Sequence, residues 1–210
     1  MTPDLGNDSS KLPHELEKYL QQFEAIEVEA REILDGLTDT HLAWRPKATA
    51  WSIADCLDHL IATGRHSLFY LAEAVDVGRA RGLLSPGPFR YGVFERWFVW
   101  LMEPPARIKL VAPRAYRPAS GRPGTLVVAE FLQLQRDLAQ SLRTANGLDF
   151  AMVKVRNPVS RWITFSLGQE FALATAHERR HLWQARRITE DPGFPRVERP
   201  SNPDWTRRRG

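Results

Sequence analysis

Apolar residues recur along the first third of the chain at spacings of three and four positions, the period of a helix with one buried face. The pattern predicts a first helix from Pro13, which a first helical turn tolerates, to about Leu37. A second helix is predicted from Ser52 to about Val77, because Ser52 can cap its free amides and Asp55 favours its positive end.

The second half of the chain repeats the helical period twice, over residues 125–146 and 166–188. Between the second and third helices, residues 78–124 are rich in Pro and Gly and contain one short aromatic helix over residues 93–102. Residues 148–166 are best interpreted as an extended connection. The sequence therefore predicts an all-α fold, a four-helix bundle with a long crossover between helices two and three.

The chain of 210 residues is long enough for one domain with a substantial core. We expect a flexible leader over residues 1–12, the bundle over residues 13–189 and a Pro- and Arg-rich tail over residues 190–210. The last segment lacks periodicity, so it is either a free tail or a strap held by Phe194 and Trp205.

The composition is that of an ordinary soluble globular protein, with 43% hydrophobic residues, 26% charged residues and a net charge of +4. Arg residues are scattered through helices that also carry acidic residues, which argues against a specific nucleic-acid partner, and the run Arg207 to Arg209 is typical of a solubilising tail. Cys56 is the single cysteine, which excludes an intrachain disulfide and a Cys-based zinc site. No export signal or membrane span is predicted, so we expect a cytoplasmic protein with no membrane partner.

The segment HERRH at residues 177–181 fits a pattern of zinc peptidases, in which two imidazoles one helical turn apart bind a metal and the Glu handles a proton. In those enzymes the third ligand lies downstream, as a His six residues after the second one or as a Glu on the next helix. Arg187 stands at the first of these positions, and no sheet edge is predicted on which a peptide could lie. The peptidase interpretation therefore lacks its supporting parts.

His59 lies midway along the predicted second helix, beside its apolar stripe. A single buried His is more often a hydrogen-bonded core residue than a ligand. Two further histidines one turn apart on another long helix reverse that balance, because three imidazoles on two facing helices can reach one ion. Such a site keeps open metal positions and suits zinc, nickel or another late divalent metal. The predicted ligands are His59, His177 and His181.

Three stretches of the chain carry a family resemblance: residues 51–60 (WSIADCLDHL), the crossover around residues 104–107 (PPAR), and residues 177–185 (HERRHLWQA). Together they resemble the DinB-like (damage-inducible) superfamily of metal-binding four-helix bundles. The first and last stretches are the specific parts of a resemblance that extends from the first helix to about Ile188. It implies a DinB-like bundle whose metal triad is one His from helix two and two from helix four, at the positions named above.

Characterised members of this superfamily include transferases and an isomerase that use low-molecular-weight thiols. The resemblance therefore implies a metal-dependent transferase in which the ion binds a thiol as thiolate, which attacks an electrophilic small-molecule substrate. Glu178 would assist as a base or as a partner of a ligand, although a solvated helix Glu is the plainer interpretation. Two alternatives stay open: a non-catalytic stress-response bundle that the ion merely staples together, and an HExxH zinc peptidase.

Several other side chains near the predicted site have weaker claims. Glu170 and Gln184 share the face of His177, and either could orient an imidazole through its second nitrogen. His66 lies two turns beyond His59, too far along the axis for a ligand. We expect His14 and His41 to lie at the surface. Three aromatic residues of the crossover could line a substrate mouth, form a homodimer contact or simply pack on the bundle: Trp97, Phe98 and Trp100.

Overall fold

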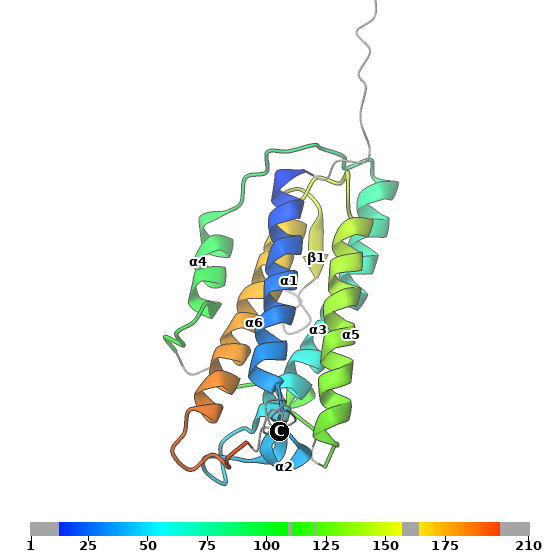
Figure 1. Cartoon of the computed structure of the whole chain (residues 1–210). Coiled ribbons are helices and arrows are strands. Elements are labelled where there is room, and N and C mark those ends of the chain that lie inside the picture. Colours follow the sequence, from blue (N-terminus) through cyan, green and yellow to red (C-terminus); the bar gives the residue numbers. More distant parts are fainter. Residues whose placement is uncertain (1–12, 109–110, 120, 157–163, 198–210) are drawn as a thin grey trace, which may run out of the picture.

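Four long helices form a bundle in the computed structural model, which describes residues 13–108, 111–119, 121–156 and 164–197 (Figure 1). They are α1 (His14–Leu34), α3 (Ile53–Ala80), α5 (Gly124–Thr144) and α6 (Leu167–Thr189). The prediction of an all-α four-helix bundle with a long crossover between its second and third long helices is confirmed. The predicted leader, Trp205 and the Arg207 to Arg209 run lie outside the described residues.

The arrangement of the four helices places the two histidine-bearing ones next to each other. Both α1 and α3 pack against α5 and α6, so α1 and α3 stand at opposite corners of the bundle. The long crossover then brings α5 between them, and α6 closes the fourth corner. As a result α3 and α6, which are more than 80 residues apart in sequence, share an interface.

The start of α3 follows its sequence pattern closely. The Ser52 hydroxyl accepts a hydrogen bond from the Asp55 amide at 3.1 Å, and the Asp55 carboxylate accepts one from the Ser52 amide at 2.7 Å. This reciprocal pair satisfies two amides that the helix itself leaves free. It fixes the first turn of α3 and, through it, the height of His59 in the bundle.

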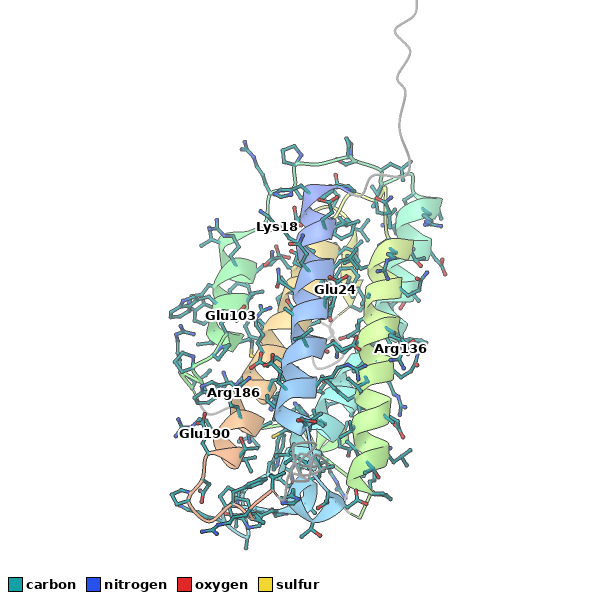
Figure 2. The ribbon with its side chains drawn as sticks, viewed as in Figure 1. Lys18, Glu24, Glu103, Arg136, Arg186 and Glu190 are labelled. Carbon is teal, nitrogen blue, oxygen red and sulfur yellow. The ribbon has the colours of Figure 1, made fainter. Side chains whose placement is uncertain are left out.

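The crossover between α3 and α5 contains the predicted aromatic helix, α4 (Val93–Met102), which lies along the outside of α6 (Figure 1). Glu103 follows the last residue of α4 (Figure 2), and the Arg179 guanidinium of α6 donates to it with an Nε to Oε2 distance of 3.0 Å. A short 3-10 turn, η1 (Arg114–Tyr116), follows α4 and was not predicted. Because η1 sits on α3, the crossover covers one end of the α3–α6 interface.

Two short elements replace segments that the sequence predicts as a turn and an extended connection. Residues 39–43 form a single helical segment, α2 (Asp39–Ala43), because Thr38 caps its first turn. Within the predicted extended connection, β1 (Lys154–Arg156) pairs antiparallel with β2 (Thr164–Ser166), so that Val155 and Phe165 stand opposite each other and are buried. Both elements add to the core, since Leu42 of α2 and Val155 of β1 belong to its buried clusters.

The bundle interior consists of two clusters of buried apolar side chains, one around Phe23, Phe150 and Phe171 and one around Ile53, Leu57 and Phe131. Burying an aliphatic or aromatic side chain of this size stabilises a fold by roughly 1.5–3 kcal/mol. Helices α3 and α5 pack closely at Gly64, where an added Cβ would lie 2.6 Å from Leu134 Cδ2.

The described part of the C-terminal segment, residues 190–197, follows the base of the bundle near α2. Phe194 packs edge-on against Trp44 with ring centroids 5.4 Å apart, and His41 Nε2 lies 3.2 Å from the Arg196 carbonyl oxygen. His41 is therefore buried, and the prediction that it lies at the surface is wrong, because this segment and α2 cover its ring. No helix in the described residues combines the length and the apolar character needed to cross a membrane.

Candidate metal centre

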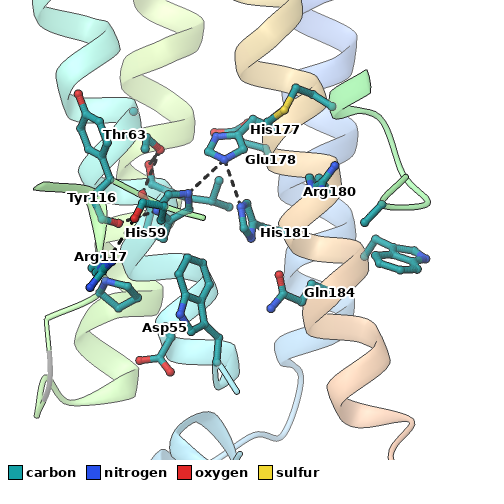
Figure 3. Close-up of a pocket in the computed structure, with 18 of the residues that line it drawn as sticks. Asp55, His59, Thr63, Tyr116, Arg117, His177, Glu178, Arg180, His181 and Gln184 are labelled. Atoms are coloured by element: carbon teal, nitrogen blue, oxygen red, sulfur yellow. Dashed lines mark hydrogen bonds between the residues drawn. The ribbon is translucent and has the colours of Figure 1, made fainter. Parts of the chain in front are cut away.

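His177 and His181 lie one turn apart on α6 and face α3 (Figure 3). Their Nε2 atoms are 3.1 Å apart. Leu182 and Ala185, on the same helix, are buried in the core and fix the rotation of α6 about its axis. The helical spacing thus brings both imidazoles to one place, as the sequence predicts.

His59 meets this pair from α3. Its Nε2 atom lies 3.2 Å from Nε2 of His177, and the ligand atoms of all three side chains lie within 4.8 Å of one another (Figure 3). Rings at these positions contact edge to face, with centroids 4.7 Å apart for His59 and His181. The structure therefore brings together the three histidines singled out in the sequence, and they could hold a metal ion.

A backbone carbonyl fixes which nitrogen of His59 faces the other rings. The Nδ1 atom lies 2.6 Å from the carbonyl oxygen of Tyr116 in η1, and a carbonyl can only accept a hydrogen bond. Nδ1 must therefore carry the proton, which leaves the lone pair of a neutral imidazole on Nε2. Metal-binding histidines commonly make this kind of hydrogen bond through their second nitrogen.

Hydrogen bonds cannot satisfy the other ring nitrogens. If His177 Nε2 carries its proton, it can donate toward His59 Nε2, but the same nitrogen cannot then accept from His181. His181 Nδ1 is also buried, with no hydrogen-bond partner among the described residues. The three ring nitrogens converge on one point, and they do not carry enough protons to satisfy one another by hydrogen bonds. A cation bound at that point would accept their lone pairs.

The nitrogen separations also fit a metal ion. Two nitrogens about 2.05 Å from one ion are about 3.3 Å apart at the tetrahedral angle and about 2.9 Å apart at 90°. The two Nε2 separations, 3.1 and 3.2 Å, lie between these values. These two separations therefore match the coordination distances of late divalent metals without selecting one of them.

Burial keeps the three imidazoles neutral, the form that binds metals. It lowers the pKa of His59, against the opposing effects of the Tyr116 carbonyl and the Asp58 charge. Burial, together with repulsion from the neighbouring rings and from Arg180, lowers the pKa of His177 well below its usual value. The same causes lower the pKa of His181 to about 3.

Comparison with known proteins agrees with this geometry. A family model described as the DinB superfamily matches residues 22–185, well over half of the chain. The chain belongs to the DinB superfamily. No protein with curated function matches its sequence.

A solved structure of the same fold is that of YfiT from Bacillus subtilis, described as a probable metal-dependent hydrolase with an unusual four-helix bundle topology. The two structures superpose with a TM-score of 0.54 and 14% sequence identity, over 83% of this chain and 86% of that chain. At this identity the likeness shows a shared fold. It supports the bundle topology of this DinB superfamily member independently of the family match.

One feature that sequence reasoning missed is the set of ion pairs that holds the crossover of this DinB superfamily protein on α3. Asp58, next to the first histidine, accepts a hydrogen bond from the Ala119 amide at 2.6 Å and forms an ion pair with Arg122, which also pairs with Glu130 of α5. Tyr116 lies three residues before Ala119 in the same crossover. Asp58 therefore helps to keep the Tyr116 carbonyl on the His59 ring, a role that an acid beside an apolar helix stripe could have suggested.

Trp51 covers the site from the start of α3. Its ring lies 5.0 Å from the ring of His59, between centroids, and stacks on His181 at 5.6 Å with an interplanar angle of 25°. A large apolar ring at this position shields two of the three imidazoles from water on one side. The sequence places Trp51 in the family motif, but only the fold shows this contact.

Glu178 differs from its plainer interpretation as a solvated helix residue, because it is 3% exposed. Its Oε1 atom accepts a hydrogen bond from Gln135 Nε2 of α5 at 2.9 Å, whereas Oε2 has no partner among the described residues. Burial, opposed by the Gln135 hydrogen bond and the Arg179 charge, raises the pKa of Glu178 to about 7. The solvated interpretation is therefore wrong, since α6 packs against helices on several sides.

A cavity of about 1080 Å³ opens beside the three histidines, which contribute to its wall. Phe98 of α4, Leu173 of α6 and Trp183 add apolar surface, and Glu170 and Gln184 add polar groups. The Ser67 hydroxyl donates to Glu170 at 2.9 Å, so this carboxyl is held by α3. The three histidines therefore face an open space with room for a small molecule.

The remaining candidate residues take other positions. His66 Nδ1 lies 2.8 Å from the Tyr116 hydroxyl and belongs to no ligand set in the described residues, as expected. The side chain of His14 is 80% exposed, which confirms its prediction as a surface residue. Trp97 and Trp100 are each 51% exposed, so about half of each side chain packs on the protein.

Proposed function

We propose that this DinB superfamily protein is a divalent-metal-dependent enzyme that acts on a small molecule, with His59, His177 and His181 as the metal ligands. The observation that carries the proposal is the convergence of three imidazole ring nitrogens at the wall of a large cavity. Three protein ligands leave coordination positions for another molecule, which is the arrangement of catalytic zinc sites. Zinc or nickel would suit the imidazole set.

For the reaction, we favour transfer of a low-molecular-weight thiol to an electrophilic carbon. A bound dication would lower the pKa of a thiol at its open positions. The thiol S–H bond breaks, a sulfur–carbon bond forms and the electrophile releases its leaving group with the bonding electron pair. Glu178 Oε2, which is buried and free of hydrogen bonds among the described residues, would accept the thiol proton. A cytoplasmic location, where small thiols stay reduced, fits this chemistry.

A metal-dependent hydrolase is a second candidate, favoured by the fold shared with YfiT, which is described as a probable metal-dependent hydrolase. In that case water would replace the thiol, and the same Glu178 oxygen would take its proton. The two candidates differ in a simple way. A transferase consumes its electrophile only when a thiol is present, whereas a hydrolase consumes its substrate in a thiol-free buffer.

The non-catalytic and peptidase alternatives receive less support. An ion that only staples a bundle would need no access to a cavity, yet the three histidines line one. In HExxH peptidases the third ligand follows the motif, whereas here the third imidazole comes from α3, upstream of it. Zinc-dependent cleavage of casein that is lost in Glu178→Ala would favour the peptidase over the proposed transferase.

The test combines metal analysis with a thiol screen. Cobalt-substituted protein is mixed with small thiols, and its visible absorption is recorded for the wild type, His59→Ala and the exposed control His14→Ala. We expect about one metal ion per chain and a thiolate charge-transfer band with at least one thiol in the wild type and the control. Absence of bound metal in the wild type, or metal retained at full stoichiometry by His59→Ala, would refute the proposed site.

A further inference from the structure

Four arginines line the same cavity as the three histidines: Arg45, Arg107, Arg117 and Arg180. Arg180 lies on α6, between the two histidines of that helix in sequence, and is only 8% exposed. The other three are exposed and stand on the segments around the cavity mouth. Figure 3 shows Arg180 and Arg117 on opposite sides of the three imidazoles.

The buried arginine has no negative partner in the described part of the chain. The Arg180 guanidinium donates to the carbonyl oxygens of Leu101, at 3.3 Å, and of Ile108. It forms no ion pair with a described carboxylate, whereas the partly exposed Arg122, Arg179 and Arg186 each do. Removing a charge from water is costly when only dipoles compensate it, so a buried cation of this kind favours a nearby anion.

Two of the exposed arginines are likewise held by neutral groups. Arg107 donates to the carbonyl oxygens of Trp100 and Glu103, each at 3.0 Å, and lies over the Trp100 ring at 4.3 Å. Arg117 donates to the Ala112 carbonyl at 3.4 Å. These contacts orient the guanidinium groups and leave their charge uncompensated. Arg45 differs, because it pairs with Asp55.

The acidic groups of the cavity do not balance these cations. Asp55 is already engaged by Arg45 and by the helix start. Burial raises the pKa of Glu170, which favours its neutral carboxyl, and the Glu178 carboxyl already accepts a hydrogen bond from Gln135 of α5. With a dication at the histidines, the wall would carry a strong positive potential, which attracts and orients anions.

We propose that the small molecule bound in this cavity carries an oxyanion group, a carboxylate or a phosphate. Arg180 and Arg107, which both lie against α4 and the segment after it, bind this group while the reacting end of the molecule faces the three histidines, and Arg117 on the other side adds to the positive potential. The inference rests on the proposed function, since it names the substrate class of that same site. A planar guanidinium presents two parallel N–H donors to an oxyanion, which gives both strength and orientation. Phe98 and Leu173 would contact the apolar part of the same molecule.

The test uses metal-loaded protein and calorimetric titration with three probes: succinate, inorganic phosphate and the neutral isostere succinamide. The variants are Arg107→Gln with Arg117→Gln, Arg180→Lys, and the control Arg136→Gln. Arg136 lies on α5, well away from α4 (Figure 2), and among the described residues its side chain hydrogen-bonds to Gln133 alone. Metal content and circular dichroism are measured first, so that a variant that fails to fold or to bind metal is recognised.

We expect wild type and Arg136→Gln to bind succinate or phosphate at least tenfold more tightly than succinamide. The double variant should bind the anion roughly five- to tenfold more weakly. Arg180→Lys should weaken binding by a similar factor, because lysine keeps the positive charge but lacks the two parallel N–H donors of a guanidinium. A preference for succinate over phosphate identifies the carboxylate, and the reverse identifies the phosphate. Equal affinity for succinate, phosphate and succinamide, or no loss in either arginine variant, overturns the inference. If metal binds normally in that case, the proposed function stands, whereas absence of metal refutes the function itself.

Discussion

Replacing His59 with alanine removes one of three ligands and should remove most of the stabilisation that a metal ion gives to the fold. If free zinc is about 100-fold above the wild-type dissociation constant, binding stabilises the folded protein by ~2.7 kcal/mol. For a chain of 210 residues this corresponds to a rise in melting temperature of about 5–11 °C. The change in melting temperature upon metal addition is therefore the quantity to compare.

The size of the loss follows from the geometry of the site. Removing a group that only supports a ligand commonly weakens metal binding by about 10- to 100-fold, so loss of an imidazole whose Nε2 is 3.2 Å from the next should cost at least the upper figure. A 100-fold weaker site at the same zinc concentration stabilises by only ~0.4 kcal/mol, or about 1 °C. The variant also leaves the Tyr116 carbonyl without its donor, which lowers stability with and without metal by roughly 1–3 kcal/mol.

Differential scanning calorimetry of chelator-treated protein, with and without zinc, separates these two effects. The intrinsic loss lowers both melting temperatures of His59→Ala equally, whereas loss of the ligand removes the difference between them. His14→Ala, whose side chain is 80% exposed, should keep the full wild-type difference. A metal-induced rise in His59→Ala equal to that of His14→Ala would contradict the assignment of His59 as a ligand.

Three further predictions concern the bundle around the site. Burial raises the pKa of Glu170, so the stability linked to this carboxyl is present below its unfolded pKa and is lost as pH rises through its folded pKa. In urea unfolding, Glu170→Gln should therefore be more stable than the metal-free wild type at pH 8, by a difference that shrinks towards pH 4. Parallel pH profiles of the two proteins would disprove this. Gly64→Ala should lower the free energy of unfolding by about 1–3 kcal/mol, because the new methyl group would lie 2.6 Å from Leu134 Cδ2. An unchanged urea midpoint would show that α3 and α5 move apart at no cost in stability. Phe131→Ala, at a fully buried position, should lower the free energy of unfolding by about 3–5 kcal/mol in the same assay. A loss below about 1 kcal/mol would mean that neighbouring side chains move to fill the cavity.

The sequence by itself determined the features that depend on neighbouring residues. The spacing of apolar positions gave the four long helices and α4, whose bounds agree with the prediction at both ends. Ser52 and Asp55 determined where α3 begins, because a capping pair acts within three residues. The four-residue spacing of His177 and His181 likewise sufficed to bring their rings together, since helix geometry alone relates them.

The tertiary structure decided everything that depends on how distant segments pack. The proton position on His59 depends on a carbonyl 57 residues away, and no local pattern indicates that Tyr116 lies there. Glu178 is buried against Gln135 because α6 is enclosed on several sides, so a polar residue on this helix need not face water. Arg180 lies in the cavity wall for the same reason. Helical periodicity fixes which residues share a face, but packing between helices fixes what that face meets, and the chemistry of this site depends on the second.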